Sequence, residues 1–237
     1  MRANSKVCFD VSAGEVHALL DQEPPDDAPL RAGLVGHQLH AQHLLGELSG
    51  FGEGFGNLHA AAFTAATRVN LGLLQPDINV MWDLAPHDIS ILLHILGQEP
   101  LQVSANGGIY LQKERRIHEV AYVTMHFADD ILANLRVSWL DPVKTRRITV
   151  VGSKKMAVYN DVENLEKIKI YDKGVDVPPY SLTEKEFQAS YRNGPESNVP
   201  YAWVEPLKTE CEHFVDCIRS GDTPRSDGEK GLKVVKI

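Results

Sequence analysis

The hydrophobic pattern of this chain changes its period at Gly97, and this change constrains the fold more than any other feature of the sequence. Before the glycine, residues 83–96 repeat apolar side chains at the spacing of one helix face, which predicts a helix. After it, apolar and polar residues alternate as far as residue 171. In Ile131 to Trp139, for example, the odd positions are apolar, which is typical of a strand with one buried face.

The alternating region divides into short segments that we expect to be neighbouring strands of one sheet. They lie at 100–105, 118–127, 131–139, 145–151, 154–160 and 165–171. Turn residues such as Asp129-Asp130 and Gly152-Ser153 separate them, so consecutive strands should pair antiparallel. Residues 172–204 are rich in Pro, Gly, Asn and Ser and predict a long loop. Further helices are predicted at 12–22, from Glu205 to Gly221, and at 228–237.

Composition excludes several classes of protein. The net charge of -8 over 237 residues argues against nucleic-acid binding, which needs clustered Lys and Arg. No apolar run approaches the length needed to span a membrane. The three cysteines (Cys8, Cys211 and Cys217) lack metal-type spacing, so we expect reduced thiols and a cytoplasmic location.

Two polar residues, Asp83 and His87, begin the helix predicted at 83–96. A spacing of four residues puts their side chains on one helix face, as a carboxylate and imidazole that together handle a proton would require. A simpler interpretation makes Asp83 the N-cap, with Pro86 in the first turn and His87 a polar residue facing solvent. Spacing alone favours the simpler interpretation.

Other patterns give weaker signals of chemistry. His37, His40 and His43 recur every three residues, as in a metal-dependent isomerase or hydrolase, but no carboxylate or Cys joins them, so no metal site is predicted. His213 and Cys217 are four residues apart and indicate packing rather than ligation. The glycines at 50–56 resemble a phosphate-binding loop only loosely, because the residues after them, 58–63, favour a strand over the required helix.

Four segments together resemble a known family of enzymes. They are Asn79 to Gly97, Val137-Ser138-Trp139-Leu140-Asp141-Pro142, Val150 to Met156, and Glu205 to Lys236. These segments are similar to the second domain of the Gfo/Idh/MocA oxidoreductases. The similarity extends over residues 68–237 and is greatest to members that oxidise nucleotide sugars, of the UDP-N-acetylglucosaminuronate 3-dehydrogenase type.

The resemblance implies an α+β fold, an open, mostly antiparallel sheet with helices on one face, preceded by the remnant of a Rossmann domain. Residues 1–36 would be that remnant, and residues 37–237 the substrate-binding and oligomerisation domain. The family's Gly-x-Gly-x-x-Gly turn is missing, and its Glu-Lys-Pro motif aligns with Lys6-Val7-Cys8, so Val7 replaces the catalytic Lys and Lys6 is a poor substitute. The chain therefore resembles a truncated or diverged member. Its cofactor, NAD or NADP, would bind to a domain that this chain lacks.

The resemblance also implies roles for individual residues. His87 would be the catalytic acid/base, and Asp83 would position the substrate or His87. Arg68 and Asn70 match polar residues of the family's substrate strand, against the alternative of ordinary strand-edge solvation. Arg192 lies in a segment where an Arg could bind a sugar-nucleotide phosphate, against the alternative of a solvated loop residue.

The expected function is therefore oxidation of a sugar or nucleotide-sugar hydroxyl. The alternative is a non-catalytic sugar-binding or assembly domain that has lost the cofactor site. Family members commonly form oligomers through the open face of the sheet. Here that interface would use Val150, Ile168 and Ile170, or their neighbours across the pleat.

Overall fold

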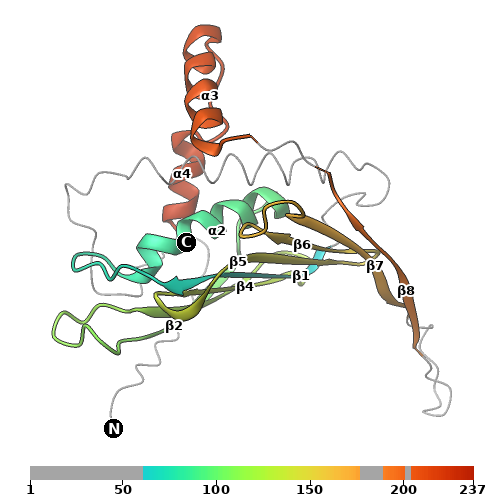
Figure 1. The fold of residues 1–237 in the computed structure, drawn as a ribbon, viewed down its shortest axis with the longest axis horizontal. Coiled ribbons are helices and arrows are strands. Elements are labelled where there is room, and N and C mark those ends of the chain that lie inside the picture. The colour runs from blue at the N-terminus through green and yellow to red at the C-terminus, as the bar shows by residue number, and fades with distance from the viewer. Residues whose placement is uncertain (1–60, 177–188, 201–203) are drawn as a thin grey trace.

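The computed structural model describes residues 61–176, 189–200 and 204–237. The helix predicted at 12–22, the Rossmann remnant, His37, His40, His43 and the glycines at 50–56 lie outside the described residues. Figure 1 shows the described elements in chain order. They are β1 (Ala61–Leu71), α2 (Val80–Leu96), β2 (Gln102–Gly108), β3 (Val120–His126), β4 (Leu132–Ser138), β5 (Leu140–Gly152), β6 (Met156–Asn160), β7 (Ile168–Asp176), β8 (Ser190–Asn198), α3 (Pro206–Ser220) and α4 (Gly228–Val235).

The strands form one eight-stranded sheet in the order β2-β3-β4-β1-β5-β6-β7-β8. The expected antiparallel pairing is confirmed within β2-β3-β4 and within β5-β6-β7. It is wrong for β4 and β5, because β1 lies between them, parallel to β4 and antiparallel to β5. The chain passes from β4 to β5 around the end of β1 at Trp139, whose carbonyl accepts the N–H of Gly72 at 3.0 Å. The fold is otherwise the predicted open, mostly antiparallel α+β sheet.

The prediction of one long loop over 172–204 is wrong. Strand β7 continues to Asp176, and β8 pairs with it antiparallel at the edge of the sheet. Gly194 and Pro195 of β8 suggested a loop, yet an edge strand tolerates them because one side of its backbone makes no ladder hydrogen bonds.

Helix α2 begins at Val80, earlier than predicted. Its N-cap is Asn79, whose side chain accepts the N–H of Trp82 at 3.1 Å. The prediction that Asp83 is the N-cap is therefore wrong, and Pro86 lies inside the helix rather than in its first turn. Asn79 offers the same capping chemistry as Asp83 one turn earlier. The predicted end at Gly97 is confirmed, with φ of 66° and its N–H bonded to the carbonyl of Leu93.

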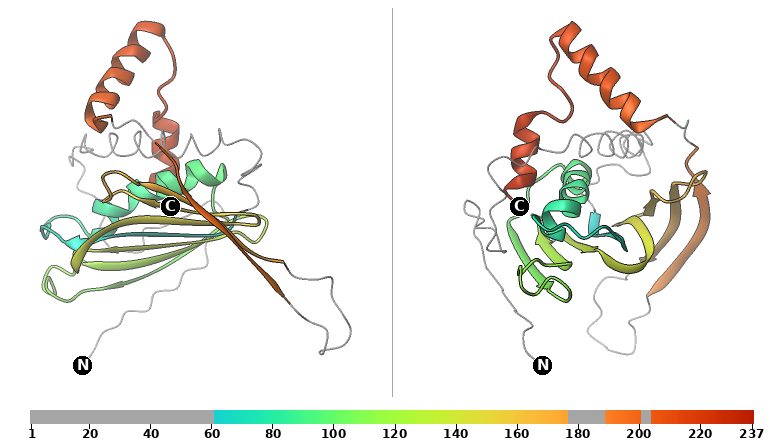
Figure 2. Two further views of the ribbon diagram at one scale, coloured as in Figure 1. Left: turned by 45° about the vertical axis from the view of Figure 1, so that its right-hand side comes forward. Right: turned by 60° about the vertical axis from the view of Figure 1, so that its left-hand side comes forward.

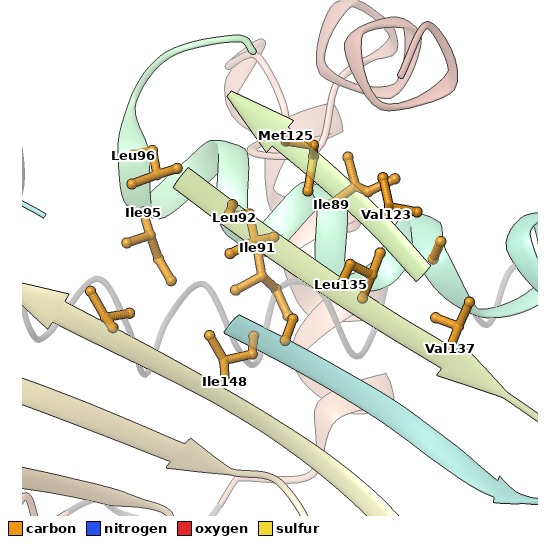
Figure 3. Packing of buried hydrophobic residues seen from close by; sticks show 14 of the residues in the cluster. Ile89, Ile91, Leu92, Ile95, Leu96, Val123, Met125, Leu135, Val137 and Ile148 are labelled. Carbon is orange, nitrogen blue, oxygen red and sulfur yellow. The ribbon is translucent and has the colours of Figure 1, made fainter. Parts of the chain in front are cut away.

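The core lies between α2 and the sheet, which curves around the helix (Figure 2). Apolar side chains of α2 pack against apolar side chains of β3, β4 and β5 (Figure 3). Those of α2 include Ile89, Ile91, Leu92 and Ile95, and those of the strands include Val123, Met125, Leu135 and Ile148. Val150, Ile168 and Ile170 are also buried in this core. They therefore do not line an interface on the open face, and the alternation of the strands leaves that face to their neighbours, such as Val151 and Tyr171.

The predicted C-terminal helices are confirmed. Glu205 caps α3, Gly221 ends it with φ of 76°, and Asp227 caps α4. Figure 1 shows α3 standing away from the sheet and α4 returning towards α2. Within the described part of the chain, none of the helices has both the length and the apolar character needed to cross a membrane.

Candidate active site

Asp83 and His87 lie one turn apart in the first half of α2, and both are partly buried. The N–H of Asp83 donates to the carbonyl of Asn79 at 3.1 Å, so its backbone already belongs to the helix. Because Asn79 serves as the cap, the Asp83 carboxylate is not needed for that role. The structure thus brings the two predicted catalytic residues together on one helix face.

Trp139 connects this pair to the sheet. Its indole Nε1–H donates to Oδ2 of Asp83 at 2.9 Å, joining residues 56 positions apart in the chain. The side chain is 1% exposed. From the sequence, Trp139 is expected only as a strand residue, in a segment that resembles the family's sheet. The available signal was its indole N–H, since a buried tryptophan usually requires a hydrogen-bond acceptor.

Arg68 of β1 forms a buried ion pair with Asp88 of α2. Its Nε lies 2.5 Å from Oδ2 and its Nη2 lies 3.3 Å from Oδ1 of the carboxylate. Burial alone would lower the pKa of the Arg68 guanidinium, but the charge and hydrogen bonds of Asp88 outweigh it and raise that pKa. Since Asp88 follows His87 directly, this pair fixes α2 against the sheet next to the predicted acid/base residue.

Asn70, the second predicted residue of β1, lies at the end of the sheet near Trp139. A Cβ atom added to Gly72 would lie 3.1 Å from Oδ1 of Asn70 and 3.2 Å from Cδ1 of Trp139. The amide and the indole therefore approach each other across a glycine that has no side chain. Asn70, Trp139 and Asp83 thus gather at one place, whereas Arg68 points into the core.

A second residue that sequence analysis missed, Glu119, orders the loop between β2 and β3. Its fully buried carboxylate accepts the backbone N–H groups of Tyr110 (2.6 Å), Leu111 (3.2 Å) and Gln112 (2.6 Å). The Glu119 carbonyl also accepts the backbone N–H of Trp139 at 3.0 Å. The loop is therefore fixed to the same residue that binds Asp83.

A small polar pocket lies between α2, β1, β5 and β6. Its lining residues are Arg68, Asp88, Ile91, Arg146, Ile148, Tyr159 and Asp161. Ile91 lies one turn after His87 on the same helix face, so the pocket adjoins the Asp83–His87 face.

Asp161 is the hydrogen-bonding centre of this pocket. Oδ1 accepts from the Tyr159 hydroxyl (2.8 Å) and from Nζ of Lys167 (3.0 Å), and Oδ2 lies 3.4 Å from Arg146. Burial alone would raise the pKa of the Asp161 carboxyl, but these partners, Lys167 first, hold it well below its usual range. Burial and the nearby Asp161 raise the pKa of the Tyr159 phenol. Asp161 is therefore ionised and Tyr159 neutral near pH 7.

Arg192, the last predicted substrate residue, lies on β8 at the far edge of the sheet. Its Nε lies 3.0 Å from Asp172 and its Nη1 lies 3.6 Å from Asp176. It also donates to the carbonyl of Lys154. Strands β5, β6 and β7 separate β8 from β1, so Arg192 does not join Asp83 and His87 in one cluster.

The described residues were compared with two patterns, a cluster of metal ligands and a dinucleotide-binding turn. Among them, no group of three His, Cys, Asp or Glu residues could hold a metal ion. His213 and Cys217 lie 3.6 Å apart (Nε2 to Sγ), and Nε2 of the same imidazole accepts the backbone N–H of Arg225, a packing arrangement as expected. Residues 61–176, 189–200 and 204–237 contain no Gly-x-Gly-x-x-Gly turn between a strand and a helix.

Comparison with known proteins finds a family model that matches part of the chain. Residues 68–158 match the family model of the GFO/IDH/MocA C-terminal domain. The matched region contains Asp83, His87 and Trp139, and the match agrees with the resemblance found in the sequence. Among curated proteins, no sequence matches the chain significantly.

Solved structures share the fold. UDP-N-acetylglucosamine 3-dehydrogenase GnnA from Acidithiobacillus ferrooxidans is 24% identical, with a TM-score of 0.65 over 84% of this chain and 57% of that one. A probable dehydrogenase from Thermotoga maritima is 19% identical (TM-score 0.59; 86% and 59% covered). An aldose-aldose oxidoreductase from Caulobacter crescentus is 14% identical (TM-score 0.56; 88% and 58% covered). The chain thus spans less than two thirds of the length of these proteins.

Proposed function

We propose that this chain is the substrate-binding and proton-transfer part of an NAD(P)-dependent dehydrogenase that acts on a sugar, specifically a nucleotide sugar. The observation that carries the proposal is the Asp83–His87 pair on α2, with Asp83 bonded to Trp139, in a domain of the Gfo/Idh/MocA type. The similarity in fold to a UDP-N-acetylglucosamine 3-dehydrogenase supports the choice of a nucleotide sugar as substrate.

The proposed chemistry needs a group that removes the proton of a sugar hydroxyl. An imidazole suits this task because its ordinary pKa lies near neutrality. His87 is the proposed acid/base, and Asp83 orients either His87 or the hydroxyl. Asn70 lies near Trp139 and is proposed as a substrate ligand, Arg68 supports the helix that carries His87, and Arg192 stays a predicted phosphate ligand. NAD or NADP would accept the hydride, bound by residues other than those described.

The decisive experiment replaces His87 in the full-length protein. His87→Ala should lower the turnover of UDP-N-acetylglucosamine about a hundredfold or more, with NADH affinity unchanged. His94→Ala is the matched control, because His94 is an exposed histidine in the last turn of the same helix. It should leave turnover unchanged. An unaltered rate in His87→Ala would remove His87 from the mechanism.

The second candidate is a non-catalytic sugar-binding or assembly domain. It is favoured by one observation, the lack of a dinucleotide-binding turn among the described residues. Calorimetric titration with UDP-N-acetylglucosamine and fluorescence titration with NADH separate the two candidates. The second candidate would be favoured if the protein bound the sugar nucleotide but not NADH, and if the full-length protein did not oxidise the sugar nucleotide.

We also propose that the protein forms homo-oligomers through the open face of the sheet, around Val151 and Tyr171. A charged residue on that face, as in Val151→Asp, should convert the assembly to monomers in sedimentation experiments. An unchanged assembly would place the interface elsewhere. The free thiols of Cys211 and Cys217 support a cytoplasmic location.

A further inference from the structure

We propose that Trp139 is a positioning residue for Asp83. Its indole N–H fixes the Asp83 carboxylate in one orientation on the face of α2 that it shares with His87. The inference rests on the proposed function, because it assigns Trp139 a purpose within that site. The hydrogen bond from Trp139 would also hold the Asp83 side chain in one rotamer whether or not the site is catalytic.

Trp139 is itself held by backbone hydrogen bonds on both sides and by burial. Its backbone N–H donates to the carbonyl of Glu119 and its carbonyl accepts the N–H of Gly72, both at 3.0 Å. These bonds join the β4–β5 connection to the neighbouring segments on both sides. With the ring almost fully buried, the indole N–H is a donor with a fixed position and direction.

Without Trp139, the Asp83 carboxylate would have other donors nearby. An aspartate in the first turn of a helix is attracted to the backbone N–H groups left unpaired there. Asn79 already occupies the capping position, and the indole holds Oδ2 of Asp83 at 2.9 Å. A carboxylate has roughly four acceptor sites, so one bond to Trp139 leaves capacity for His87 or a substrate hydroxyl.

Gly72 leaves room for the indole of Trp139. Any Cβ at this position would lie 3.2 Å from Cδ1 of Trp139, the ring atom next to Nε1, and would press on the edge that carries the donor. Gly72 therefore lets the indole reach Asp83 while its own N–H bonds the Trp139 carbonyl.

A double-mutant cycle tests whether Trp139 acts through Asp83. Trp139→Phe removes the donor but keeps an aromatic ring. It should weaken binding of UDP-N-acetylglucosamine, or lower its turnover, about tenfold. A loss of this size corresponds to the free energy that a hydrogen bond to a charged group contributes. In an Asp83→Ala background the same change should have almost no further effect. A tenfold loss in both backgrounds would mean that Trp139 serves only packing, and would overturn the proposal.

An NMR measurement tests the inference without any activity. In the wild type, the α–β proton couplings of Asp83 should report a single χ1 rotamer, and in Trp139→Phe they should become averaged. Trp82→Phe is the control, because Trp82 precedes Asp83 on α2 and should leave the couplings unchanged. Unaveraged couplings in Trp139→Phe would refute the positioning role. If the wild type binds no sugar nucleotide, the proposed function fails, while these couplings still decide the role of Trp139.

Discussion

Arg68 and Arg192 are both paired with aspartates, but Arg68 is buried and Arg192 is partly exposed. The side chains of Arg68 and Asp88 are 8% and 2% exposed, and two contacts join them at the centre of the sheet. Arg192, on the edge strand β8, is 35% exposed and shares its guanidinium between Asp172 and Asp176. Water is excluded from the Arg68–Asp88 pair, whereas it competes with the aspartates for hydrogen bonds to Arg192.

The difference teaches that the place of a strand in the sheet decides what an ion pair does. A buried pair gains little over an apolar pair, yet losing one partner leaves a charge without water or counterion. An exposed pair loses little when broken, because water replaces the partner. Arg68 is therefore required by the fold itself, whereas Arg192 is available for interactions outside it.

The largest expected effect is at the centre of the sheet. Arg68→Ala leaves the Asp88 carboxylate buried and unpaired, so we expect the free energy of unfolding to fall by about 3–5 kcal/mol. Urea denaturation followed by circular dichroism measures this change.

The matched control replaces both partners. Arg68→Met combined with Asp88→Leu removes both charges and keeps apolar volume, and should recover most of the lost stability. A loss below about 1 kcal/mol in Arg68→Ala would equal that of an exposed pair and would remove the contrast between the two arginines.

An intermediate effect is expected at Asp161, which is partly exposed but has three partners. Asp161→Asn leaves Lys167 and Arg146 without their counterion and should cost about 2 kcal/mol at pH 7. The pKa of the Asp161 carboxyl is lowered in the folded protein. Its contribution is therefore complete above the unfolded pKa of about 3.9, and is lost as the pH falls through the folded value.

Unfolding of wild type and Asp161→Asn, compared between pH 7 and pH 3, checks this sign. The stability difference should narrow below about pH 4. A difference that is constant with pH would show that the carboxylate charge contributes nothing. Tyr159→Phe removes one neutral donor only and should cost about 1 kcal/mol.

The elements that the sequence predicted well are those with local signals. Glycine in the left-handed conformation ended α2 and α3 at Gly97 and Gly221, and strict alternation located the strands from β2 to β7. The start of α2 was misplaced because Asn79 and Asp83 share the same capping chemistry. Strand β8 was missed because its Gly194 and Pro195 are typical of loops as well as of edge strands.

The candidate site was predictable only along α2. Asp83 and His87 are related by helical spacing, which the sequence states directly. The partners that fix them come from other strands: Trp139 contacts Asp83 across 56 positions, and Arg68 contacts Asp88 across 20. Such contacts depend on the insertion of β1 between β4 and β5, a long-range pairing for which periodicity gives no signal.

The smallest expected effect is at the edge of the sheet. Arg192→Ala breaks its exposed pairs with Asp172 and Asp176 and should change the free energy of unfolding by less than about 1 kcal/mol, with less dependence on salt than the wild type. Arg192→Lys, which keeps the charge, is the matched control.

Titration of both variants with UDP then tests the predicted phosphate role of Arg192. A loss of UDP affinity in a variant of normal stability would support it, because β8 needs no guanidinium to remain folded. Unchanged affinity would leave Arg192 with its edge pairs alone, and a large loss of stability would contradict the contrast with Arg68.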